Sequence, residues 1–288
     1  MQMATFSQDG SVNYKFTFLL FTFSSFASAF QPIDEAVVPS GKYYVGSVFG
    51  QHDYAEHPNI TLDAFRIMRS EVTYRLYTDV HTWATQHGYA FGSGCNGAAN
   101  EDCLPADTDK GAHPVTNVEW ADAVIFANAL SEKTRLRPVY LNRNGAPARD
   151  SASYAFTVDP QAEGYRLPTA EEWQVAARGG VAGLKNGTYG YSFAGSKNAS
   201  AVACFPDFNH PDFGTATVKS FKPNAAGLYD MSGNVAEWVY AFDTISGVKM
   251  YYFCGGSYMV HTSSLANCDT HSAGYALPDV GFRLVRKY

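Results

Sequence analysis

The stretch Tyr165-Arg-Leu-Pro-Thr-Ala-Glu-Glu-Trp-Gln-Val-Ala-Ala-Arg178 carries the signals for the beginning of a helix. Thr169 and Glu172 have the spacing of a capping box, in which a hydroxyl and a carboxylate each accept a hydrogen bond from a free backbone N–H group. Pro168 ends the preceding strand, and Gly179-Gly180 is a stop signal. We therefore expect a short helix after Thr169 and no further helix beyond the glycine pair, where short strands and long turns follow.

Two more helices are predicted upstream of this stretch. Ser70 offers an N-cap to a helix that ends at Gly88. Thr116 and Glu119 form a second capping box, for a helix that ends before Pro138. Apolar side chains recur along one face of this second helix, at Trp120, Ala123, Val124, Ala127 and Leu130.

Short strands are expected around the helices, and long irregular segments separate them. The strand patterns cover the ranges 37–46, 60–68 and 139–141. Residues 92–113 and 144–164 show no periodicity and are predicted to be loops. Helices followed by strands, in a chain without a linker, predict one loop-rich α+β domain over residues 37–288.

The charge pattern excludes some partners. The net charge is -6, and charged residues make up 17% of the chain without any basic run. We therefore expect no nucleic acid partner. No apolar run reaches the ~20 residues that a transmembrane helix needs, so no membrane span is predicted.

The five cysteines show no C-x-x-C spacing, which disfavours a zinc ribbon or a thioredoxin-like motif. Cys95 and Cys103 bracket a short loop rich in Gly and Asn. They are interpreted either as a disulfide or as two separate thiols. The odd count leaves at least one thiol unpaired within the chain.

Residues 1–36 are predicted to be an extension that precedes the domain. Lys15 comes before an apolar run and before Ala27-Ser-Ala29, which is the order of a secretory signal. Asp9-Gly10 followed by strand-like alternation also fits an added β-hairpin. We expect export to the cell surface or secretion, with a cytoplasmic location as the alternative.

Five segments follow the order found in one known family. They are 61–73 (TLDAFRIMRSEVT), 114–123 (PVTNVEWADA), 165–178, 227–238 (GLYDMSGNVAEW), and 255–258 (GGSY) paired with 281–285 (GFRLV). In these motifs the chain resembles the formylglycine-generating, or sulfatase-modifying, enzymes. The resemblance implies a C-type-lectin-like fold. These motifs are evidence for the fold more directly than for a function.

The resemblance also implies where catalytic chemistry should lie. The family's enzymes use two cysteines after Gly-Gly-Ser to bind copper, because soft thiolates suit Cu(I). In this chain those positions hold Val260 and Leu265, and Cys268 is out of register. We therefore expect no copper and no enzymatic activity. A divergent copper-dependent oxidase is the alternative.

A calcium site is implied by the same resemblance. The family provides two side-chain and two carbonyl oxygens in one loop, which here correspond to Asp230, Gly233, Val235 and Glu237. Hard oxygen ligands suit Ca²⁺. The alternative is that Asp230 caps a turn while Glu237 is a buried, hydrogen-bonded carboxylate.

Residues 239–280 form a segment poor in charge and rich in Tyr, Ser, Thr, His, Asn and Gly, as in an antibody paratope. In layout the segment resembles the hypervariable part of the variable proteins of diversity-generating retroelements. The resemblance implies a non-catalytic protein that displays a variable ligand-binding site on this segment. The resemblance implies a monomer that binds an unknown protein or cell-surface molecule. The predicted ligand-binding residues are Asp243, Thr244, Tyr251, Tyr252, Tyr258, Val260, His261, Ser263, Asp269, His271, Ala276 and Leu277.

Strand alternation adds an expectation about exposure, since only about half of the strand residues can point outward. Trp120, Trp173, Trp238 and Phe282 are expected to be buried scaffold. The side chains expected to be exposed and close together are Tyr252, Tyr258, Val260, His261, Asp269, His271, Ala276 and Leu277.

Overall fold

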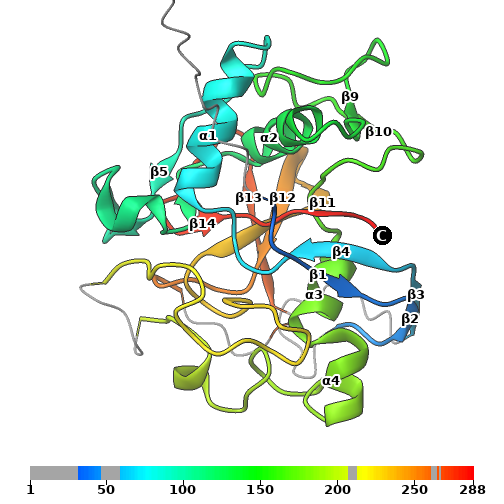
Figure 1. Ribbon diagram of the computed structural model, residues 1–288, viewed down its shortest axis with the longest axis vertical. Coiled ribbons are helices and arrows are strands. Elements are labelled where there is room, and N and C mark those ends of the chain that lie inside the picture. Colours follow the sequence, from blue (N-terminus) through cyan, green and yellow to red (C-terminus); the bar gives the residue numbers. More distant parts are fainter. Residues whose placement is uncertain (1–31, 47–58, 207–212, 261–264, 266) are drawn as a thin grey trace, which may run out of the picture. The chain divides into compact units, whose positions relative to one another are not determined.

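The computed structural model describes residues 32–46, 59–206, 213–260, 265 and 267–288, and its main unit runs from Asp34 to Tyr288 (Figure 1). The predicted N-terminal extension, apart from its last residues, lies outside the described residues. His261 and Ser263 lie outside them as well. Within the described residues, no helix is long and apolar enough to cross a membrane.

A three-stranded antiparallel sheet joins the two ends of this unit. Its order is β1 (Glu35–Val38), β4 (Phe65–Met68) and β15 (Val285–Lys287). An ion pair reinforces this closure, because Arg286 contacts Glu35 at 2.6 Å. The last strand therefore lies in the same sheet as the first.

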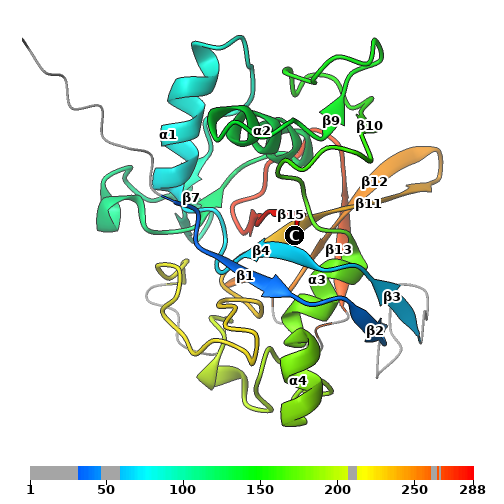
Figure 2. The ribbon, with the colours of Figure 1, turned by 45° about the vertical axis from the view of Figure 1, so that its right-hand side comes forward.

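A four-stranded sheet carries the C-terminal motifs (Figure 2). Its order is β13 (Cys268–Ser272), β12 (Val248–Cys254), β11 (Ala236–Ile245) and β14 (Val280–Gly281). β11 and β12 form a hairpin whose register shifts between Trp238 and Phe242. Figure 2 shows the turn of this hairpin, in orange, pointing away from α4.

Helices α1 (Tyr74–Thr85) and α2 (Trp120–Lys133) begin at caps that differ from the predicted ones. The N-cap of α1 is Thr73, not Ser70. The N-cap of α2 is Glu119, and its capping-box partner is Asp122, so the predicted box of Thr116 with Glu119 is wrong. The reason is that Thr116 belongs to a strand.

Helix α3 (Ala170–Ala177) begins as predicted. Thr169 Oγ1 accepts a hydrogen bond from the N–H of Glu172 at 3.1 Å, and Glu172 Oε2 accepts one from the N–H of Thr169 at 2.9 Å. The expectation of no further helix is wrong, because α4 (Gly180–Asn186) follows at once. Gly179 has a φ of 84°, so a left-handed residue ends one helix and begins the next.

The region predicted as an irregular loop over 92–113 contains short paired elements. A disulfide joins Cys95 to Cys103, which resolves the two interpretations of this pair. The remaining short elements are β2 (Gly41–Tyr43) with β3 (Ile60–Leu62), β5 (Cys95–Asn96) with β8 (Val115–Thr116), β6 (Ala98–Ala99) with β7 (Asp102–Cys103), β9 (Tyr140–Leu141) with β10 (Thr157–Val158), η1 (Thr108–Gly111) and η2 (Ala199–Ala201).

The predicted scaffold aromatics are buried. Trp120, Trp173, Trp238 and Phe282 are all 3% exposed or less. Trp173 packs in a cluster that joins α3 to β1, β4 and the four-stranded sheet. The mixture of helices and small sheets confirms the α+β class.

Candidate functional site

The carboxylate of Glu237, a predicted calcium ligand, accepts three hydrogen bonds from buried side chains. Arg283 donates to both of its oxygens, at 2.7 and 2.6 Å, and Trp173 Nε1 donates to Oε2 at 2.8 Å. Arg283 is 0% exposed and Glu237 is 1% exposed. The two family motifs, at 227–238 and 281–285, are thus joined by a buried ion pair.

Asp230, the other predicted carboxylate ligand, is also buried. Its Oδ2 accepts a hydrogen bond from the N–H of Lys219 at 2.6 Å, whereas Oδ1 has no partner. Glu71 Oε2 is likewise buried without a partner. Burial, together with the charge of Asp230, raises the pKa of Glu71 well above its usual range.

These contacts fit calcium only in part. Ca²⁺ takes six to eight oxygen ligands, and the Glu237 carboxylate already accepts three hydrogen bonds. Within the described residues, no group of three or more His, Cys, Asp or Glu side chains could hold a metal ion. Calcium binding through Asp230, Gly233, Val235 and Glu237 stays a prediction.

The positions of the family's copper-binding thiolates hold side chains without metal-binding chemistry. Val260 is 56% exposed and Leu265 is 1% exposed. A disulfide joins Cys254 to Cys268, so neither of the nearby cysteines is a thiol. Cys204 is free but buried, and burial, with the Asp230 charge, raises its pKa to about 12. A high thiol pKa leaves little of the reactive thiolate at neutral pH.

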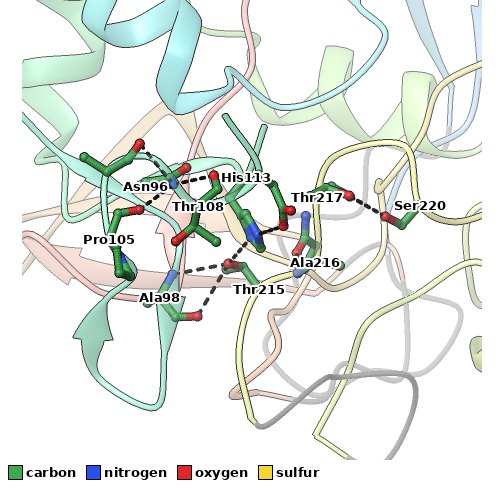
Figure 3. A network of polar contacts seen from close by, with 12 residues as sticks. Asn96, Ala98, Pro105, Thr108, His113, Thr215, Ala216, Thr217 and Ser220 are labelled. Carbon is green, nitrogen blue, oxygen red and sulfur yellow. Dashed lines mark hydrogen bonds and ion pairs between the residues drawn. The ribbon is translucent and has the colours of Figure 1, made fainter. Parts of the chain in front are cut away.

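A buried polar network joins residues of the segment 96–113 to Thr215 (Figure 3). His113 contacts Thr215 Oγ1 through Nδ1 at 2.9 Å and Asp109 through Nε2 at 3.0 Å. Asn96 donates to the carbonyls of Pro105 and Thr108, at 2.9 Å each. The network was not predicted, and its contact between His113 and Thr215 joins residues that are far apart along the chain.

Tyr258 packs beside this network, which corrects its predicted exposure. Its side chain is 0% exposed, lies in a cluster with Ala98, Cys204 and Ala216, and donates a hydrogen bond to the Asn100 carbonyl. Tyr258 is therefore scaffold. Its place after Gly-Gly-Ser looks like a surface turn in the sequence, and only the distant loop around Asn100 covers it.

The other predicted ligand-binding residues differ in exposure. Exposed side chains are those of Asp243, Thr244, Val260, Asp269 and Ala276; partly buried ones are those of Tyr252, His271 and Leu277; Tyr251 is buried. The strand members also fall on two faces. Thr244, Tyr251 and His271 share one face of the sheet, and Asp243 and Tyr252 lie on the other.

An aromatic surface surrounds Tyr251, and most of its members were not predicted. Trp120 stacks on Tyr251 with ring centroids 4.3 Å apart, and Phe242 lies 6.1 Å from it. Lys249 Nζ lies 3.7 Å from the centre of the Phe242 ring. The aromatic surface is defined here as Trp120, Tyr154, Tyr240, Phe242, Tyr251 and Tyr275, with Lys249 and His271. Trp120 and Tyr251 are buried at the base of this group, whereas Phe242 and Tyr275 are its exposed rings.

Two relatives of known sequence are similar over long stretches. The chain is 30% identical over 257 residues to the chaperone protein LppX of Paenibacillus barcinonensis, covering 79% of this chain and 82% of that protein. It is also 30% identical over 158 residues to the inactive C-alpha-formylglycine-generating enzyme 2 of Mus musculus, covering 54% of this chain and 48% of that protein. The name of the second relative describes it as an inactive formylglycine-generating enzyme.

Two solved structures are similar over most of the chain. CarF superposes with a TM-score of 0.83 and 53% identity, covering 89% of this chain and 99% of that chain. Treponema denticola variable protein 1 superposes with a TM-score of 0.66 and 26% identity, covering 88% and 95%. The resemblance to the variable proteins is thus confirmed, but CarF is more similar, which corrects the expectation that a variable protein is the nearest relative.

The family comparison agrees with the motifs and with the fold. The family described as sulfatase-modifying factor enzyme 1-like domains matches residues 23–288. Its C-type-lectin-like fold of the formylglycine-generating type is the one seen here, with few helices and several small sheets. The chain belongs to the family of sulfatase-modifying factor enzyme 1-like domains.

Proposed function

We propose that this chain is a non-catalytic, ligand-binding member of the family. The observation that carries the proposal is the state of the two thiolate positions, where Val260 lies at the surface and Leu265 is buried. Neither side chain binds a metal. The remaining cysteines are in disulfides or, for Cys204, buried.

The ligand site is the exposed part of the segment 239–280. Its strands are held by a buried ion pair and a disulfide, so that surface side chains are free to change without loss of the fold. We propose that a diversity-generating retroelement varies these side chains, as the similarity to a variable protein suggests. The ligand is a protein or a cell-surface molecule, and the chaperone name of one relative supports a protein.

The cellular location proposed is the cell surface or the exterior. Two disulfides support it, because disulfides persist mainly in oxidising compartments. A peptide tag placed at the N-terminus tests this location. Cleavage during export would remove the tag from the mature protein, whereas an uncleaved cytoplasmic chain would keep it.

The absence of catalysis is tested with Cu(I), oxygen and a sulfatase-type cysteine peptide. We expect no aldehyde above the buffer value, while an active family member converts the same peptide. Aldehyde formation by this chain would support the alternative, a divergent copper-dependent oxidase.

Diversification is tested in the DNA beside the gene. We expect a near-copy of the segment encoding 239–280 that differs only at adenines, next to a reverse-transcriptase gene. Absence of such a copy would leave a binding domain with a fixed site and would reject the retroelement.

Tolerance of the surface is tested by replacing Asp243, Thr244, Asp269 and Ala276 together. Exposed substitutions usually change stability by within about 0.5 kcal/mol each, whereas truncation of a core aromatic such as Trp173→Ala costs roughly 3–5 kcal/mol. We expect the combined surface variant to melt cooperatively near the wild-type temperature. A loss as large as that of Trp173→Ala would contradict the display function.

A further inference from the structure

Lys249 is a cation without a carboxylate partner on the aromatic surface. Its Nζ lies 3.7 Å from the centre of the Phe242 ring and 5.3 Å from that of Tyr251. It forms no ion pair with any described residue, and burial lowers its pKa. Ring faces attract the ammonium group, but its hydrogen-bonding capacity for an anion is not used by them.

Two polar atoms beside Lys249 have no hydrogen-bond partner among the described residues. They are the hydroxyl of Tyr251 and Nδ1 of His271, and both are buried. Tyr251 and His271 are directly opposite each other in β12 and β13. Lys249 lies two residues from Tyr251 on the same strand, so the three side chains share one face of the sheet.

Unpaired buried polar groups are rare in folded proteins, because each has lost its water without gaining a partner. Two of them on paired residues, on the same face of the sheet as an unpaired cation, indicate that a group from outside the chain completes the set. All three can donate a hydrogen bond: an ammonium, a phenol and an imidazole N–H. The complementary group is an acceptor with negative charge.

The rings around these donors define the rest of the ligand. Phe242 is 48% exposed and Tyr275 is 53% exposed, and Tyr275 lies 4.0 Å from His271 between ring centroids. Glu119, an acid beside Tyr154, already accepts a hydrogen bond from that residue and caps α2. An apolar or aromatic part of a ligand could therefore pack against the exposed rings of Phe242 and Tyr275, next to the three donors.

We propose that Lys249, Tyr251 and His271 form a subsite for a carboxylate that is carried on an aromatic or apolar body. The inference rests on the proposed ligand-binding function, since it names the chemistry that the same surface recognises. The exposed residues around the subsite would determine which ligand binds. The three donors would bind the carboxylate that all of these ligands share.

The subsite is tested by calorimetric titration of the full chain with 4-phenylbutyrate, 4-phenylbutan-1-ol and 4-phenylbutylamine. We expect the carboxylate to bind more tightly than the alcohol, and the amine to bind least. Lys249→Met should weaken the carboxylate about tenfold and leave the alcohol unchanged. Lys185→Met, on α4, is the matched control and should change neither.

Tyr251→Phe separates binding from structure. Because the hydroxyl has no partner in the free protein, its removal should leave the melting temperature unchanged or raise it, while weakening 4-phenylbutyrate about fivefold. A lower melting temperature with unchanged binding would overturn the proposal, as would preferred binding of the amine or binding of none of the probes.

The outcomes of this test can be told apart from those that test the proposed function. Aldehyde formation from the cysteine peptide, with normal 4-phenylbutyrate binding, would reject the non-catalytic function and keep the subsite. Failure of all three probes, with no aldehyde and a tolerant surface, would reject the subsite and keep the function.

Discussion

Neutralising Glu237 should reveal how much of the domain's stability depends on one buried ion pair. Glu237→Gln keeps the size of the side chain and an acceptor for Trp173, but it removes the carboxylate charge that is hydrogen-bonded to the Arg283 guanidinium. Removing one partner of a buried pair costs about 3–5 kcal/mol. For a domain of this size, about 2–4 °C per kcal/mol gives a fall in melting temperature of roughly 6–20 °C.

The assay is urea unfolding under non-reducing conditions, with Glu163→Gln as the matched control. Glu163 pairs with Arg137 at 3.7 Å, but both side chains are about half exposed, at 51% and 52%. The control should therefore cost less than about 1 kcal/mol. Replacing both partners, in Glu237→Gln with Arg283→Met, should cost less than the sum of the single variants. Equal, small losses for Glu237→Gln and Glu163→Gln would refute the reasoning.

Three further predictions follow from the same region. Calcium should raise the melting temperature relative to chelator, because a ligand bound only by the native state stabilises it; an unchanged response in Asp230→Ala would place the site elsewhere. Loss of the disulfide in Cys254→Ser with Cys268→Ser should cost about 3 kcal/mol, for a separation of 14 residues, in denaturant titrations. Burial raises the pKa of Asp279, so the folded state holds this proton more tightly than the unfolded chain, and stability should fall as the pH rises through the raised pKa. Asp279→Asn should remove that fall while still accepting from Ser257, so an identical drop from pH 4 to pH 7 in both proteins would contradict it.

Local signals in the sequence were sufficient where the interaction itself is local. The capping box of Thr169 and Glu172 joins residues three apart, and it was predicted correctly. The box at Thr116 was wrong because the β5–β8 pairing places Thr116 in a strand, and Glu119 caps α2 with Asp122 as its capping-box partner. A distant strand thus decided between two similar local patterns.

The site was harder to predict because long-range contacts determine which side chains are reachable. Tyr258 is covered by the loop around Asn100, and nothing near Tyr258 in the sequence indicates that loop. Trp120 reaches Tyr251 across more than a hundred residues of chain, so composition alone did not join them. The motifs predicted the fold family, whereas the aromatic surface required the packed chain.

The disulfide between Cys254 and Cys268 has a consequence for how this region can evolve. The two cysteines face each other at the ends of β12 and β13, so the segment between them is the closed arc of a covalent ring. The Cys254–Cys268 disulfide holds the register of β12 and β13 at that end, whatever the sequence of the segment between the two cysteines. Changes in the arc that spare its buried residues, Tyr258 and Leu265, therefore leave the anchoring strands joined. A single peptide-bond cut within the arc leaves the chain in one piece until the sulfurs are reduced.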